Sequence, residues 1–402
     1  MEDPDAESWA ITMTPARDAP IILLAEYYAS GGTRTYLKQL LNFYGELDQE
    51  VVLVACHDEP DEEIASLLRR MDSRFVSYWS VVSGSHNLSD PTLQPNVWSL
   101  GQQRRERLAV SRLMDETGAK GVIVSAGTPG QFAGASGASV HSIYILHTYP
   151  HGRRQLVLGP SFMARVFRST RNFVAVSAFQ KKAMIHAWRL KSRRASIRVI
   201  PNTAGDMLEA RSLPSQPPQE VLTASWVESY KDPGSWLATA RTVIRRLGEQ
   251  SVRFRWLGEG SLLDEFRQRV AVEALYPAVD FEGYVEGVSR AYAKASVYLL
   301  MSTTENMSMS VIDSLRHGLP SVVANVRGPN GIIAHGSTGF VIEPGDVDDA
   351  VRNIERLLSD SKFWIRMSEE GQRHYSRFFS PERWYSDIRD LHDQVFSSGR
   401  RL

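Results

Sequence analysis

The stretch from Val297 to Val323 constrains the fold more than any other, because it reads as a strand, a loop, a helix, a turn and a second strand. An apolar run at 297–301 gives way to a loop rich in Ser and Thr, and apolar residues then recur at helical spacing until Gly318 and Pro320 end the helix. Such a unit brings a helix N-terminus to the carboxyl end of a parallel strand. Ligands of open α/β sheets bind at that edge, where free backbone N–H groups suit a phosphate.

Two carboxylates frame the loop of this unit. Glu305 precedes the helix, and Asp313 lies within the helix. A loop carboxylate can accept hydrogen bonds from hexose hydroxyls, and one in the early helix can accept them from a ribose diol, while the amides of Ser308 and Met309 face a diphosphate. The alternative is that Glu305 is a solvated loop residue and that Asp313 only stabilises the helix N-terminus electrostatically.

This segment resembles the Glu-x7-Glu signature of the retaining glycosyltransferases of family 4, with Asp313 in place of the second Glu. The resemblance implies an α/β chain with the GT-B fold, in which two Rossmann-like domains with parallel sheets face a cleft. It also implies that the residues after Glu305 contact the donor. The usual small and aromatic residues are replaced there, so the sequence does not indicate the sugar; the residues present are Asn306, Met307, Ser308 and Met309.

The N-terminal half alternates predicted strands and helices, which favours a parallel sheet. Gly31 and Gly32 follow its first strand, and their position is similar to that of the glycine loop that lies beside the donor diphosphate in the family. Taken alone, such a pair is a tight turn. His147 ends a later strand and resembles a histidine at the edge of the family's active site; it could equally be structural. The predicted strands are 21–25, 51–55, 75–79, 121–125 and 142–146.

The second half departs from the family at one position. Family members place an Arg and a Lys, five residues apart, against the donor diphosphate; Lys231 matches the Lys, but Trp226 stands where the Arg is expected. Lys is only a point charge, whereas Arg can bind phosphate through two parallel hydrogen bonds. The departure indicates weaker donor binding, a changed donor, lost activity or a substitute cation such as Arg34 or Arg327. The resemblance also places the backbone near Tyr284 and Val285 beside the base.

Composition bounds the class of protein. The 402 residues suffice for two domains, and Lys plus Arg equals Asp plus Glu at 46 each. A single cysteine, Cys56, excludes an internal disulfide and any Cys/His metal cluster. The sequence lacks a signal-peptide pattern and a long apolar run, so we expect a cytoplasmic protein, with association at the inner face of the membrane as one option. The metal-like Asp346-Val-Asp348 is interpreted as a helix cap.

The predicted boundaries follow from composition and periodicity. A stretch with Gly205 and three prolines has no periodic pattern and suits a linker. The parts are a flexible tail at 1–19, an N-terminal acceptor domain at 20–203, a linker at 204–220, a nucleotide-sugar domain at 221–378 and a C-terminal helix at 379–402 that crosses back to the first domain.

Charge is unevenly distributed. No Asp or Glu occurs from 117 to 205, although thirteen Lys and Arg do. An amphipathic helix is predicted near 162–171, and a second basic helix near 178–190. The apolar residues of the first could pack on the sheet, or the helices could lie on an anionic membrane. We expect an anionic partner for the whole stretch, either a membrane, a lipid-linked phosphate acceptor or an acidic glycan, and no nucleic acid.

The expected function is transfer of a hexose, with retention, from a nucleoside diphosphate sugar such as a UDP-sugar to an acceptor hydroxyl of a glycan, glycolipid or small molecule. Glu305, His147 and Lys231 are the expected catalytic residues, and we expect no metal or prosthetic group. Two alternatives remain. One is a non-catalytic sugar-nucleotide-binding or partner subunit of a glycosyltransferase complex, and the other is a GT-B epimerase or phosphorylase-like enzyme.

Overall fold

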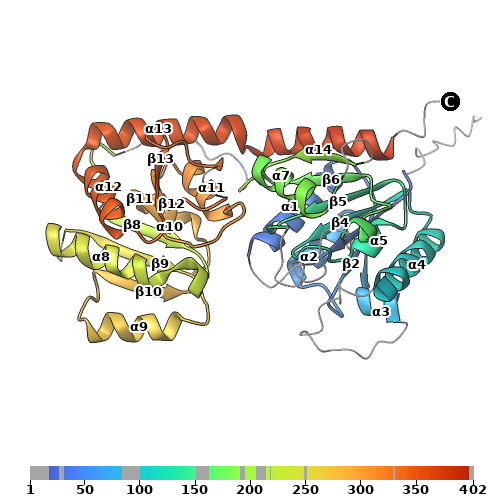
Figure 1. The fold of residues 1–402 in the computed structure, drawn as a ribbon, viewed down its shortest axis with the longest axis horizontal. Coiled ribbons are helices and arrows are strands. Elements are labelled where there is room, and N and C mark those ends of the chain that lie inside the picture. Colours follow the sequence, from blue (N-terminus) through green and yellow to red (C-terminus); the bar gives the residue numbers. More distant parts are fainter. Residues whose placement is uncertain are drawn as a thin grey trace, which may run out of the picture.

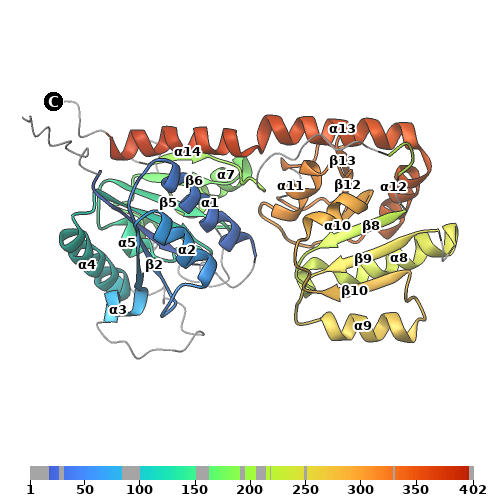
Figure 2. The same cartoon turned by 180° about the vertical axis from the view of Figure 1, so that it is seen from behind.

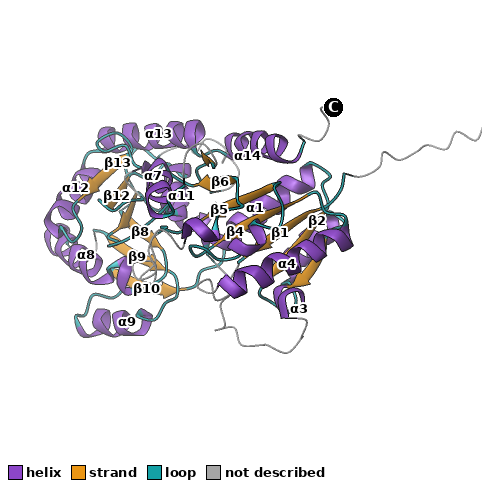
Figure 3. Cartoon of the chain, turned by 45° about the vertical axis from the view of Figure 1, so that its right-hand side comes forward, coloured by secondary structure: helices purple, strands orange, loops and turns teal. Residues whose placement is uncertain are grey.

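The computed structural model describes residues 18–26, 31–83, 100–150, 163–190, 195–204, 214–217, 219–248, 251–328 and 331–397. Two parallel sheets lie side by side, each covered by helices on both faces (Figures 1 and 3). The expected GT-B architecture is confirmed. The predicted linker lies mostly outside the described residues, as do residues 1–17 of the predicted tail.

The first sheet has seven parallel strands in the order β3-β2-β1-β4-β5-β6-β7. β1 and β2 are buried at every position because both faces of the sheet are covered. The helices α1, α2 and α14 pack on one face, and α3, α4, α5 and α7 on the other. The strands are β1 (Ile21–Ala25), β2 (Val51–Ala55), β3 (Arg74–Ser77), β4 (Gly121–Ala126), β5 (Ser142–Leu146), β6 (Asn172–Ala175) and β7 (Ser196–Val199). The helices are α1 (Gly32–Glu46), α2 (Glu62–Arg70), α3 (Tyr78–Ser83), α4 (Leu100–Thr117), α5 (Ala133–Ser136) and α7 (Ala178–Ala187).

The second sheet has six parallel strands in the order β10-β9-β8-β11-β12-β13. Its two core clusters fill the space between the sheet and the surrounding helices. The strands are β8 (Glu220–Ala224), β9 (Arg253–Leu257), β10 (Val279–Gly283), β11 (Val297–Leu300), β12 (Ser321–Ala324) and β13 (Gly339–Ile342). The helices are α8 (Pro233–Leu247), α9 (Leu263–Val272), α10 (Ser289–Lys294), α11 (Met309–Arg316), α12 (Val347–Ser359) and α13 (Ser361–Phe378), with a 3-10 turn at Ser229–Lys231.

The last helix, α14 (Pro381–Phe396), follows α13 closely and runs along the first domain (Figure 2). Ser380 caps it, its hydroxyl accepting a hydrogen bond from the Arg383 amide. Trp384, Ile388, Leu391 and Val395 belong to the core that also contains β1 and β2. The C-terminal end of the chain therefore completes the hydrophobic core of the N-terminal domain.

Two local predictions can be compared with these bounds. The strand predicted at 75–79 ends at Ser77, because the chain turns there into α3 and buries Tyr78, whose hydroxyl donates to Glu106 at 2.7 Å. The interpretation of Asp346 as a cap is confirmed, since its side chain accepts a hydrogen bond from the Asp349 amide at the start of α12.

Candidate active site

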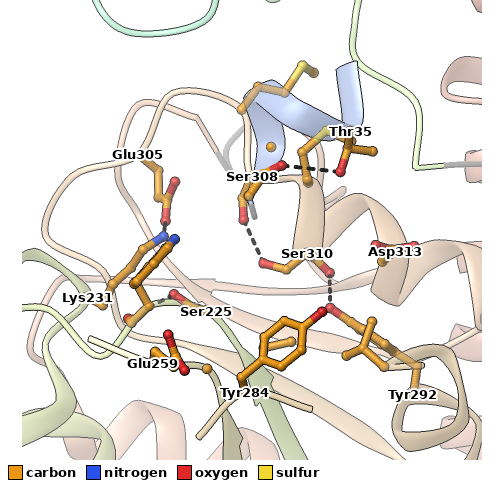
Figure 4. A pocket seen from close by; sticks show the side chains of 18 of the residues that line it. Thr35, Ser225, Lys231, Glu259, Tyr284, Tyr292, Glu305, Ser308, Ser310 and Asp313 are labelled. Atoms are coloured by element: carbon orange, nitrogen blue, oxygen red, sulfur yellow. Dashed lines mark hydrogen bonds and ion pairs between the residues drawn. The ribbon is translucent and has the colours of Figure 1, made fainter. Parts of the chain in front are cut away.

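A cavity of about 370 Å³ lies in the cleft between the two domains (Figure 4). The carboxyl edge of the second sheet forms one side of this cavity. Gly31 and Gly32, at the start of α1, form the opposite side. Several of the sequence-predicted residues line it together: Gly31, Gly32, Lys231, Tyr284, Glu305, Met307, Ser308, Met309 and Asp313. The structure thus gathers residues that lie far apart in the sequence.

Helix α11 directs its N-terminus into this cavity. β11 ends at Leu300, and the helix begins at Met309 after the loop. Ser308 occupies the cap position, but its hydroxyl pairs with that of Ser310 at 3.0 Å and makes no capping bond to the helix. The first amides of α11 are therefore available to a ligand, and the positive end of the helix dipole favours an anion there.

Glu305 and Lys231 form an ion pair on one wall of the cavity (Figure 4). Both side chains are close to buried, with exposed fractions of 10% and 11%. The same Glu305 oxygen accepts a hydrogen bond from the Ser302 hydroxyl at 3.1 Å. The pair fixes one carboxylate and one cation side by side, which is the arrangement needed to hold a sugar hydroxyl next to a phosphate.

Asp313 lies farther along α11, at the other side of the cavity (Figure 4). Burial raises the pKa of its carboxyl to about 7, and Arg316, 3.3 Å away, only partly opposes this effect. A carboxyl with such a pKa exchanges its proton near neutral pH. A diol that donates to it would favour the ionised form.

His147 lies on the N-terminal side of the cleft, in a second cavity that adjoins the first. Its Nε2 is 2.8 Å from the Ser125 hydroxyl, and the Tyr36 ring packs edge-on against it at 4.4 Å between centroids. Burial lowers the pKa of His147 to about 4. The imidazole is therefore neutral at physiological pH and can donate or accept a hydrogen bond without carrying charge.

The glycine loop meets the second domain closely. Gly31 has a φ of 104°, in the region that favours glycine, and directly precedes α1. A Cβ on Gly32 would lie 3.3 Å from Cγ of Met309, so a side chain at position 32 would press on the start of α11. Both glycines thus allow the two domains to approach each other at the cavity.

Two predicted donor contacts lie elsewhere. Neither Val285 nor Asn306 is among the described residues that line the cavity. Val285 packs against the core of the second domain, while the Asn306 amide donates to the carbonyl oxygen of His147 at 2.7 Å. Asn306 therefore links the signature loop to the first domain.

Trp226 lines the cavity where the family would place an arginine, and it is 43% exposed. The two suggested substitute cations do not replace that arginine. Arg34 is bound to Asp61 and Glu63, and Arg327 lies over the rings of Tyr149 and Phe179 at 4.8 and 5.7 Å; neither is among the described residues that line the cavity.

Sequence reasoning missed some of the lining residues. Glu259 lies in the turn that follows β9 at the carboxyl edge of the sheet, a position that could have identified it as a lining residue. Tyr230 immediately precedes Lys231 and lines the same cavity. Ser225 directly follows β8 and likewise has a positional signal.

The basic stretch contributes to neither cavity through its described Lys and Arg. Met163 and Phe167 are buried in the core, with Phe167 stacked on Trp188, and Arg165 and Arg168 are exposed. The apolar side of this predicted amphipathic helix therefore packs on the sheet. Phe162 and five of the thirteen cations, Arg153, Arg154, Lys191, Arg193 and Arg194, lie outside the described residues.

Membrane spans and metal clusters are both missing from the described residues. No helix there is both long enough and apolar enough to span a membrane. Within the same residues, no group of three or more His, Cys, Asp or Glu side chains has an arrangement that could bind a metal ion.

Sequence comparison finds relatives of the second domain. Residues 219–360 match the model of the glycosyl transferases group 1. The sulfoquinovosyl transferase SQD2 of Arabidopsis thaliana is 33% identical over 132 residues, which are 31% of this chain and 24% of that protein. An Escherichia coli UDP-Gal:alpha-D-GlcNAc-diphosphoundecaprenol alpha-1,3-galactosyltransferase is 23% identical over 40% of this chain and 42% of its own length. The chain spans between 14% and 60% of the length of the first curated relatives.

Structural comparison extends over nearly the whole chain. TarM matches with a TM-score of 0.72 at 12% identity, over 95% of this chain and all of that one. Anabaena Alr3699/HepE in complex with UDP and glucose matches with a TM-score of 0.69 at 15% identity, over 93% and 99% of the two chains. At these identities the likeness shows the fold. The chain has the GT-B fold, and its residues 219–360 are similar to the glycosyl transferases group 1.

Proposed function

We propose that the protein transfers a hexosyl unit from a UDP-sugar to an acceptor hydroxyl, with retention of the anomeric configuration. The observation that carries the proposal is the Glu305–Lys231 pair next to the open N-terminus of α11, opposite the glycine loop. The pair and the helix supply a sugar-hydroxyl acceptor and two sources of positive potential within one cavity. The choice of uridine rests on the similar fold of HepE, which was solved in complex with UDP and glucose.

In this proposal, Lys231 and the first amides of α11 stabilise the leaving diphosphate. Glu305 accepts hydrogen bonds from the sugar hydroxyls, and Asp313 accepts them from the ribose. His147, neutral because of its burial, contacts the sugar from the first domain. These groups supply the charge that the leaving group needs, so we expect no resident metal to be required.

The bond from the anomeric carbon to the diphosphate oxygen breaks, and its electron pair leaves with UDP. The acceptor oxygen forms the new bond on the same face, and its proton passes to the departing diphosphate oxygen. No protein nucleophile takes part in this step, and retention follows from attack on the face from which UDP leaves.

An anionic membrane is proposed as the surface on which the protein works. The support is helix α7, which exposes Phe179 and Ile185 by 41% and 40%, with Lys182 exposed on the same helix and Arg189 exposed just after it. Apolar and basic side chains together favour the interface of an anionic bilayer. Because the described basic residues line neither cavity, this charge does not support an anionic acceptor.

Calorimetric titration with UDP-, GDP- and dTDP-sugars tests the donor, followed by an assay of each binder for slow hydrolysis. We expect one UDP-sugar to bind and to be hydrolysed, and the Glu305→Ala variant to lose hydrolysis and transfer with its fold intact. If no sugar nucleotide binds, the proposal is wrong. Binding without any turnover would instead support the non-catalytic partner subunit that Trp226 suggests.

A further inference from the structure

The second cavity, of about 900 Å³, occupies the position from which an acceptor would approach the donor sugar. It shares Glu305, Trp226 and the glycine pair with the donor cavity and extends to His147 and Asn202. An acceptor hydroxyl in this space would lie next to the sugar held by Glu305. The lining of this cavity therefore bears on the chemical class of the acceptor.

The charged side chains among the described residues that line this cavity are all carboxylates, and that of Glu305 is paired with Lys231. Glu228, Glu259 and Glu305 contribute carboxylates, and no described lining residue is a Lys or an Arg. Hydrogen bonds of 2.8 Å from the amide and the hydroxyl of Ser261 hold the Glu228 carboxylate in place. Two cations directly follow lining residues in the sequence, and each already has an ion-pair partner. Lys231 is bound to Glu305, and Arg34 is bound to Asp61. A phosphate or carboxylate on the acceptor would meet like charge here.

Trp226 forms an aromatic wall between the two cavities, because it lines both. It faces the first domain: a Cβ on Gly31 would lie 3.9 Å from its indole nitrogen. Tyr230, 41% exposed, adds a second ring to the same cavity. Trp offers the most favourable ring for a cation and a flat apolar face for a sugar ring.

We propose that the acceptor is uncharged or cationic, such as a neutral or amino-bearing sugar, and that its ring rests on Trp226. An ammonium group on it is attracted by the indole face and by Glu228 and Glu259. The inference rests on the proposed function and deepens it. The residue that replaces the expected phosphate-binding arginine then selects the acceptor, while the diphosphate relies on Lys231 and α11.

Three matched probes test the charge preference: methyl 6-amino-6-deoxyglucoside, methyl glucoside and methyl glucuronide, which differ only at carbon 6. Each is added to the UDP-saturated protein and observed by saturation-transfer NMR, and each is also supplied with the bound donor in a transfer assay read by mass spectrometry. We expect the amine to bind best and the glucuronide worst, by about twofold for each exposed carboxylate that the charged group meets at low salt, and we expect the difference to shrink as salt rises.

Variants at position 226 test the role of the ring. Trp226→Ala should weaken binding of the amino probe by about five- to thirtyfold, and Trp226→Phe should restore most of it. Trp226→Arg should reverse the order and favour the glucuronide. Val272→Ala, at an exposed position outside both cavities, serves as the matched control.

Two results would overturn the inference: glucuronide binding as strong as that of the amine, or an amino probe whose binding is unaffected by Trp226→Ala. Failure of all three probes to bind would also overturn it. The UDP titration is read separately from the probes. Absence of UDP binding refutes the proposed function, whereas UDP binding with the wrong charge order refutes only the acceptor class.

Discussion

Glu305→Gln should tighten the binding of UDP while it removes sugar transfer. In the structure, Glu305 holds the ammonium of Lys231 in an ion pair whose side chains are about one-tenth exposed. A diphosphate must share that ammonium with Glu305. When the carboxylate is neutralised, the ammonium of Lys231 interacts mainly with the diphosphate. The affinity for UDP therefore rises, while the hydrogen bonds from Glu305 to the sugar are weakened.

The magnitude follows from the burial of the pair. Two unit charges about 4 Å apart at an effective dielectric constant of about 20 interact by about 4 kcal/mol. In the Glu305→Gln variant, Lys231 keeps part of its interaction with the amide oxygen of the new side chain, and solvent in the open cavity screens the remainder. We therefore expect UDP to bind about 1–2 kcal/mol more favourably, which lowers its dissociation constant by about five- to thirtyfold.

Calorimetry with UDP at low and high salt measures this effect, with thermal unfolding as the check on the fold. Glu259→Gln is the matched control, because Glu259 is an exposed carboxylate that lines the same cavity and has no ion pair with Lys231. We expect a change of about twofold at most from this control. If the folded Glu305→Gln variant binds UDP no more tightly than the wild type does, Lys231 does not face the diphosphate and the donor geometry is wrong.

Further predictions concern the pH dependence of donor binding, the backbone conformation at Gly31, the pH dependence of stability and binding to membranes. Burial raises the pKa of Asp313 to about 7, and a ribose diol needs its ionised form. The affinity for UDP-glucose, measured by calorimetry, should therefore fall up to about tenfold from pH 8 to pH 6. In the Asp313→Asn variant this affinity should not depend on pH over the same range. Gly31→Ala should lower stability by about 2 kcal/mol in denaturant unfolding, since its φ of 104° strains any side chain. Burial also raises the pKa of the Glu106 carboxyl to about 7. Above about pH 4 the unfolded state releases a proton that the folded state still holds. The free energy of unfolding should therefore fall by about 3 kcal/mol between pH 4.5 and pH 7. Glu106→Gln should remove that slope, and an unchanged slope would exclude this carboxyl as its source. Phosphatidylglycerol vesicles should sediment the protein at low salt, and the double change Phe179→Ser and Lys182→Glu should release it; equal sedimentation of the variant would contradict the membrane surface.

The fold was largely predictable because its strands are short apolar runs buried on both faces. The bounds of β1, β2 and β5 match those expected from the sequence. The prediction for 75–79 was wrong at its end, because periodicity cannot show that a polar partner, Glu106, draws Tyr78 into a helix. That contact joins positions 28 apart in the sequence, and no local pattern reports it.

Most of the residues predicted for the site line one cavity, but their pairings could not be predicted. Spacing and resemblance identified Glu305 and Lys231, yet only the folded chain shows that they neutralise each other. Likewise, the sequence allows Arg34 as a phosphate ligand, but the structure pairs it with Asp61, just before α2, and with Glu63, on α2. Such ion pairs depend on which loops meet at the sheet edge, which composition and periodicity leave undetermined.

The position of α14 has a consequence for the order in which the protein is made. Trp384 and Leu391 close the core around β1, although they are synthesised long after it, at the other end of the chain. The hydrophobic core of the N-terminal domain is therefore incomplete until α14 has been synthesised. The second domain has its own core, and its strands are complete before α14 appears, so it can finish folding first. We therefore expect the second domain to finish folding before the first, the reverse of the usual order from the N-terminus onward.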